Sequence, residues 1–161
     1  MLGQAELDTI KEYHSLESAL REPDKVYRLQ LTKRKYKEVP PEIRQLKNLN
    51  ALDLGRNKLK ELPEWMGELA YMQEFRAPQN KFSEMPAVIC RWPHLKRLDM
   101  HQNELAGLPA CMGDLKELVS LDLWSNELGD FPDELKGMEA LRFMDLPVIQ
   151  FDEKDMERIT E

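Results

Sequence analysis

The chain has 161 residues, of which 42% are hydrophobic and 33% are charged, and its formal net charge is −7. This composition describes one folded globular domain with its own core, and it excludes a disordered or fibrous chain. No apolar stretch approaches the roughly 20 residues that a membrane-spanning helix needs. The acidic balance argues against generic binding of nucleic acids or anionic membranes, which both rely on clustered lysine and arginine.

Residues 1–25 are predicted to form a helical amino-terminal cap. Its apolar residues follow one another at helical spacing, which indicates one amphipathic helix or two short ones ending near Pro23: Leu7, Ile10, Tyr13, Leu16 and Leu20. The segment has neither the basic start nor the apolar run of a secretion signal. We therefore expect a cytoplasmic protein.

From residue 26 to about 151 the chain repeats a pattern of 23 residues, in five full units and a partial sixth. The units open at Val26, Leu49, Met72, Leu95, Leu118 and Leu141. Within each unit the first, fourth and sixth residues are apolar, and polar residues alternate with them. This alternation predicts a short strand with one buried face.

The later part of each unit predicts a turn and a return. An asparagine occupies the ninth position of four units, at Asn57, Asn80, Asn103 and Asn126. Because asparagine is a poor core residue unless its amide is hydrogen-bonded, this column indicates a structural ladder. An apolar-proline pair and two further apolar residues then predict a short helical return on the far side.

Residues 152–161 are predicted to form a carboxyl-terminal cap helix with Asp152 as its N-cap. It ends abruptly at Glu161, so both a truncated cap and mobile last residues stay open. One unit cannot bury its own apolar row, so the caps and the repeats form one structural domain.

The stretches "LNALDLGRNKLKELPEWMGEL" and "LVSLDLWSNELGDFPDELKGM" follow the pattern LxxLxLxxNxLxxLPxxIxxL almost throughout. In this the chain resembles the leucine-rich repeat proteins. The resemblance implies an α/β solenoid shaped as a horseshoe arc, with a parallel β-sheet on the concave side and short helical or 3-10 returns on the convex side. Arg34 and Ile149 replace the ladder asparagine in the first and last units, which marks these units as edges.

On such an arc the third, fifth and seventh residues of each unit face the open concave side. Trp124 is the strongest candidate for a partner contact, because an exposed tryptophan is costly unless it is covered, although it could instead fold over Phe143 or the cap. The aspartates have a competing explanation as solvated surface residues or ion-pair partners of Arg76 and Arg97. The full candidate set is Trp124, Phe143, His101, Arg97, Arg76, Asp99, Asp122, Arg56 and Glu74.

The concave strip is predicted to be more basic than the chain as a whole. Its basic residues are Arg28, Lys33, Arg56, Arg76, Lys96, Arg97 and Arg142, and its acids are Asp53, Glu74, Asp99, Asp122 and Asp145. Seven minus five leaves a charge of +2 on a chain of −7. A protein or peptide partner with an acidic segment next to apolar residues would suit this strip.

The sequence offers little for catalysis or metal binding. Cys90 and Cys111 form no CxxC pair and are expected to be buried free thiols, and the three histidines lack metal-ligand spacing. Asp99, His101 and Asp122 could lie together, but no nucleophile accompanies them. We expect no metal, no cofactor and no enzyme, and instead a non-catalytic interaction module that is a monomer or a weak homo-oligomer. Two alternatives remain: a recognition fragment of a larger signalling, effector or ubiquitin-ligase assembly, and a self-associating scaffold.

Overall fold

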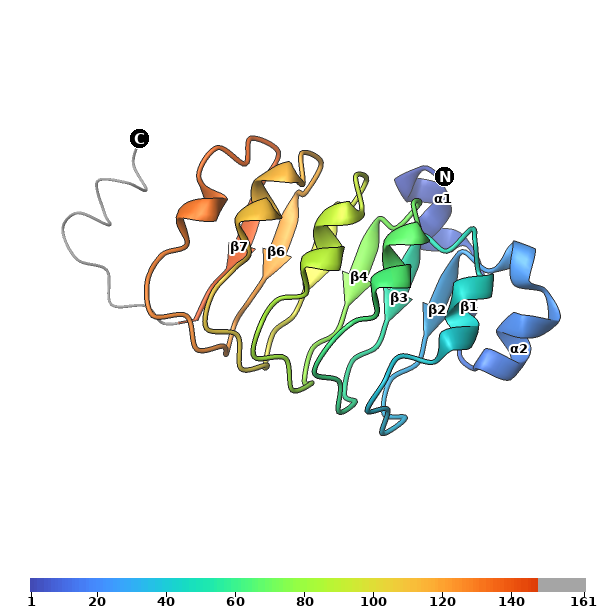
Figure 1. Ribbon diagram of the computed structural model, residues 1–161. Helices are drawn as coiled ribbons and strands as arrows, with labels where there is room; N and C mark the ends of the chain where they lie inside the picture. The colour runs from blue at the N-terminus through green and yellow to red at the C-terminus, as the bar shows by residue number, and fades with distance from the viewer. Residues whose placement is uncertain (148–161) are drawn as a thin grey trace.

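A computed structural model describes residues 1–147 and contains one parallel sheet of seven strands in chain order. The strands are β1 (Glu12–Tyr13), β2 (Arg28–Gln30), β3 (Ala51–Asp53), β4 (Glu74–Arg76), β5 (Arg97–Asp99), β6 (Ser120–Asp122) and β7 (Phe143–Asp145). Figure 1 shows them side by side along an open arc, with the returns on the other side. The predicted α/β solenoid is confirmed.

Short 3-10 helices form the convex side. They are η2 (Pro41–Gln45), η3 (Glu64–Glu68), η4 (Ala87–Arg91), η5 (Ala110–Asp114) and η6 (Asp133–Leu135). Each follows or begins with a proline. Proline fixes the backbone angle at the entry, and the tight 3-10 geometry reverses the chain within the few residues that one unit allows.

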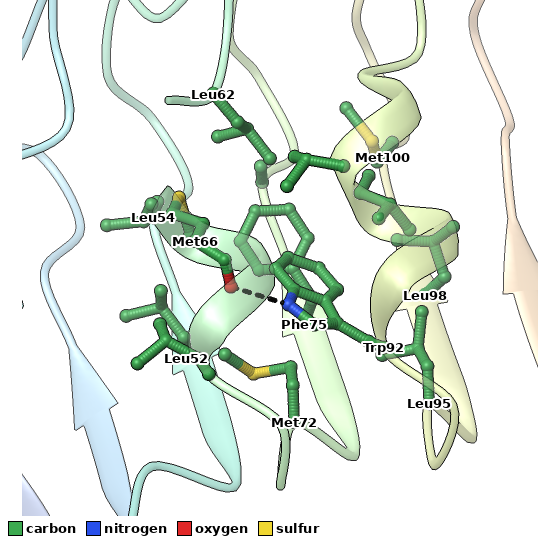
Figure 2. Packing of buried hydrophobic residues seen from close by; sticks show 14 of the residues in the cluster. Leu52, Leu54, Leu62, Met66, Met72, Phe75, Trp92, Leu95, Leu98 and Met100 are labelled. Atoms are coloured by element: carbon green, nitrogen blue, oxygen red, sulfur yellow. Dashed lines mark hydrogen bonds between the residues drawn. The ribbon is translucent and has the colours of Figure 1, made fainter. Parts of the chain in front are cut away.

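The core lies between the sheet and these returns (Figure 2). Trp92 and Phe75 are its largest fully buried side chains, and their ring centroids lie 5.1 Å apart. The indole Nε1 of Trp92 donates a hydrogen bond to the carbonyl oxygen of Met66 at 2.8 Å. Trp92 therefore joins two neighbouring units by both packing and a hydrogen bond.

The predicted asparagine ladder is present. The Nδ2 group of Asn80 donates to the carbonyl oxygens of Leu54 and Ala77 at 3.0 and 3.2 Å, and its Oδ1 accepts from the Leu59 amide at 3.0 Å. Asn57, Asn103 and Asn126 make the equivalent contacts in their own units. Each side chain thus bonds the backbone of its own unit and of the preceding one.

The amino-terminal cap contains two short helices, α1 (Gln4–Thr9) and α2 (Leu16–Arg21), and a 3-10 turn η1 (Pro23–Lys25). Between the helices, Tyr13 lies in strand β1, which pairs with β2 and extends the sheet. Strand β1 and helix α2 cover this end of the core, where Tyr13 and Ala19 belong to the main core cluster. The helical pattern through Tyr13 was misleading, because a helix face and a strand that buries a single side chain look alike over two residues.

The prediction of free thiols was wrong, because Cys90 and Cys111 form a disulfide between η4 and η5. Their separation of 21 residues differs from the 23-residue repeat, so the spacing alone did not place them together. The carboxyl-terminal cap with Asp152, and Ile149, lie outside the described residues. Within residues 1–147, no helix is long and apolar enough to span a membrane.

Candidate functional site

The sheet register places the candidate residues in rows across its concave face. Arg28, Ala51, Glu74, Arg97, Ser120 and Phe143 form the third-position row. Gln30, Asp53, Arg76, Asp99, Asp122 and Asp145 form the fifth-position row. His101 and Trp124 follow at the strand ends, and Arg56 lies in the next turn. The structure therefore brings all nine predicted site residues onto one continuous surface.

The aspartates of the fifth-position row stabilise the turns that follow them. Asp53, Asp99 and Asp122 each accept a hydrogen bond from the backbone amide two residues later, at 2.8, 3.1 and 3.0 Å. Burial raises the pKa of the Asp122 carboxyl, and the neighbouring Asp99 and Asp145 raise it further. Asp99 and Asp122 thus have a structural role that is independent of any partner.

The arginines of the concave face are partly neutralised within the chain. Arg76 lies 3.0 Å from the Asp99 carboxylate and 3.7 Å from that of Asp53, and Arg97 lies 3.3 Å from Glu74. Exposed pairs of this kind contribute little to stability, so a partner could exchange with them. The predicted pairing of an aspartate with Arg76 is confirmed, whereas Arg97 pairs with Glu74.

The aromatic end of the strip is open. Trp124 is 48% exposed and Phe143 is 68% exposed. Among the described residues, the ring pair found is Phe75 with Trp92, so Trp124 does not fold over Phe143. Trp124, in the turn after β6, and Phe143, in β7 opposite Ser120, therefore both face solvent, and such side chains are typical anchors of protein interfaces.

Among residues 1–147, Asp99, His101 and Asp122 form a group that could hold a metal ion, since one ligand atom from each lies within 4.8 Å of the others. However, Asp99 already accepts from His101 Nδ1 at 2.5 Å and from the Arg76 guanidinium at 3.0 Å. A cation at this place would have to displace a positive charge. No hydroxyl or thiol among residues 1–147 is found hydrogen-bonded to His101, so the cluster lacks an activated nucleophile.

A basic rim runs along the turns that leave β2, β3 and β4. The concave basic residues predicted from the sequence include only two residues of this rim, Lys33 and Arg56. The rim consists of the exposed residues Lys33, Arg34, Lys35, Lys37, Arg56, Lys58, Lys60 and Lys81. Arg34 donates to the His14 carbonyl oxygen. The run "KRKYK" at residues 33–37 was the available signal. Lys33, Arg56, Arg76 and His101 line a shallow hollow beside this rim.

Comparisons with known proteins agree with this geometry. A family model described as Leucine Rich Repeat matches residues 117–138. The leucine-rich repeat protein LIC12759 of Leptospira interrogans is 32% identical, superposes with a TM-score of 0.82, and is matched over 92% of this chain and 38% of its own.

Two internalins of Listeria monocytogenes share the fold at lower identity. InlF is 21% identical with a TM-score of 0.64, and internalin C2 is 19% identical with a TM-score of 0.71. Each match covers 83% of this chain, and 37% and 58% of the internalin chains respectively. The present chain therefore spans less than two thirds of each of these structures. The search of curated proteins found no match.

Proposed function

The chain belongs to the leucine-rich repeat proteins, and from this premise we propose that it is a non-catalytic module that binds a protein or peptide partner on its concave face. The observation that carries the proposal is the exposure of Trp124 and Phe143 at one end of that face. Exposed aromatic side chains beside polar groups are stabilised most when a partner covers them.

The positions of the basic rim and of Trp124 support a partner with an acidic segment next to apolar residues. The rim and Trp124 lie along the same edge of the concave strip, since the turns of successive units stack through backbone hydrogen bonds, such as Arg56 to Pro78 at 2.8 Å and Gln102 to Trp124 at 2.8 Å. Four strand spacings of about 4.8 Å separate Lys33 from Trp124 and give roughly 19 Å. About six extended residues would bridge this distance.

Replacing both Trp124 and Phe143 by alanine is expected to weaken the affinity for the captured partner by about 100-fold, as expected for loss of interface anchors. The partner is first recovered by affinity capture with the wild-type chain and then titrated against each variant by calorimetry. Tyr71→Ala is the matched control, because Tyr71 is an exposed aromatic residue outside the strip. Equal affinity of wild type and double variant, with unchanged thermal unfolding, would reject the proposal.

The disulfide is relevant to the cellular compartment in which the protein functions. Disulfides persist in oxidising compartments and are rare in the cytosol. The Cys90–Cys111 bond therefore supports an oxidising compartment rather than the cytoplasm that the sequence suggested. We expect alkylation of the unreduced native protein to leave both cysteines unmodified, as read by mass spectrometry. Full alkylation without reductant would support the cytoplasm instead.

A further inference from the structure

Helix α1 and the residues before it lie across the amino-terminal edge of the concave sheet rather than over the end of the core. The backbone of Leu2 is held from both sides: its amide donates to Asn50 Oδ1 at 3.1 Å, and its carbonyl oxygen accepts from Gln73 Nε2 at 2.7 Å. Gln73 Nε2 also donates to Asn50 Oδ1 at 2.6 Å. The side chains of Asn50 and Gln73 thus hydrogen-bond both polar groups of the Leu2 backbone, as side chains do in peptide recognition.

The other end of this segment is held by Arg28. Its guanidinium donates to the carbonyl oxygens of Leu7 and Asp8 at 3.0 and 3.3 Å, at the end of α1. Leu7 is fully buried, yet it does not belong to the main core cluster. Ala51, which lies between Arg28 and Glu74 in the third-position row, is likewise buried outside that cluster. Leu7 is therefore buried apart from the main core, and the bond from Arg28 to its carbonyl oxygen places it beside the third-position row.

The amino-terminal segment does not provide hydrogen bonds for all the buried polar atoms of the residues that hold it. In the described part of the chain, two buried side-chain polar atoms lack a hydrogen bond, and they are Arg28 Nε and Gln73 Oε1. Both belong to residues that hold the amino-terminal segment. Gln73 itself is fully buried. Because buried polar groups are nearly always hydrogen-bonded, an unpaired donor of Arg28 and an unpaired acceptor of Gln73 beside the same segment indicate a site that another segment could fill more completely.

We propose that Arg28, Asn50 and Gln73 together form a binding site for a peptide main chain, occupied here by residues 1–9 and available to a partner segment that displaces them. The fitting segment has an extended residue whose amide and carbonyl pair with Asn50 and Gln73. A leucine-like side chain fills the site of Leu7, and carbonyl oxygens at its end face Arg28. This site goes beyond the proposed function, because it lies at the other edge of the strip from Trp124.

The resident segment is suited to displacement. Helix α1 has six residues, too few to be stable on its own, so its order depends on these contacts and on the hydrogen bond from Gln4 Nε2 to Glu74 Oε1 at 2.9 Å. Its exposed face carries Asp8 and Thr9, and its attachment to the body runs through Ile10 and Lys11. A segment of this kind opens more readily than the stacked units.

The test uses the full-length chain with Leu7→Asp, which removes the apolar contact, and a fluorescent peptide of residues 1–10 as the probe. The variant is expected to bind the peptide at least 100-fold more tightly than wild type does, because in the wild type the tethered segment competes. Adding Gln73→Met, which keeps the length and removes the amide, should weaken that binding at least tenfold. Adding Trp124→Ala should leave it unchanged, so the result is independent of the aromatic end.

Circular dichroism shows whether each variant keeps the fold, since the proposal concerns only folded chains. Equal peptide binding by folded wild type and Leu7→Asp would overturn the proposal. So would full binding by the folded Leu7→Asp, Gln73→Met variant, because the main-chain contact would then contribute nothing. Should Gln73→Met unfold the chain, Asn50→Leu provides the same comparison at the other side of the Leu2 main chain.

Discussion

Replacing Trp92 by alanine is expected to lower the free energy of unfolding by about 3–5 kcal/mol, the range for large-to-small changes at buried aromatic residues. Trp92 is fully buried, packs on Phe75 and donates to the Met66 carbonyl oxygen. The change would leave a cavity between two units and would remove one of the two hydrogen bonds that the Met66 carbonyl oxygen accepts, the other coming from the Leu69 amide (Figure 2). Because each unit is stabilised mainly by its neighbours, the loss falls on the middle of the stack.

Urea denaturation followed by circular dichroism measures this effect. Trp65→Ala is the control, since Trp65 is half-buried on the convex side and packs on the edge of the core. Its loss is expected to be smaller than that of Trp92. A loss below about 1 kcal/mol for Trp92→Ala would show that the two units do not depend on this contact.

Asn80→Ala has the second largest expected effect, a loss of about 1–3 kcal/mol, because a buried group left without its partner costs roughly that much. The substitution would leave the amide of Leu59 without its acceptor. The carbonyl oxygens of Leu54 and Ala77 would each lose one hydrogen bond and keep the one that Asn57 or Asn103 donates. These groups lie in the interior between two units. The Leu59 amide cannot find another partner without separating the turns.

Asn126→Ala is the matched control, because Asn126 makes the equivalent contacts near the open end and is only half-buried. Water can replace part of its hydrogen bonding, so its loss should be clearly smaller than that of Asn80. Thermal unfolding of both variants measures the difference. Equal losses of stability in the two variants would mean that burial does not determine how much a ladder asparagine stabilises the fold.

The repeat made most of the fold predictable from the sequence. A period of 23 residues with apolar residues at constant positions assigns the strands, their parallel register and the buried rows at once, because each unit must stack on its neighbour. The same register placed Trp124, Phe143 and His101 on the concave face. Each of these inferences needs only the residues of one unit and of the units beside it.

Features that depend on departures from the repeat were not predictable in this way. The position of α1 depends on Asn50 and Gln73, which occur once each at the second position of their units and look like ordinary polar surface residues. The disulfide joins positions that the repeat does not align. The basic rim was missed because the charge was counted over the concave columns alone, whereas Lys35, Lys58 and Lys81 lie two residues past the last column.

The structural role of the aspartates changes how the candidate site is understood. Since Asp99 and Asp122 bond the backbone of their own turns, substituting them would disturb the positions of His101 and Trp124. Loss of binding in such variants would not identify a direct contact. Trp124 and Phe143 are the informative positions, because their side chains face solvent and contribute little to the stack.

The most direct test of concave-face binding is amide hydrogen exchange of the chain with and without its captured partner, read by mass spectrometry. We predict that protection gained on binding includes the peptides covering Ser120–Ser125 and Phe143–Asp145, which carry the aromatic end. Protection confined to peptides from the convex returns η2 to η5, with β6 and β7 unchanged, would contradict the account.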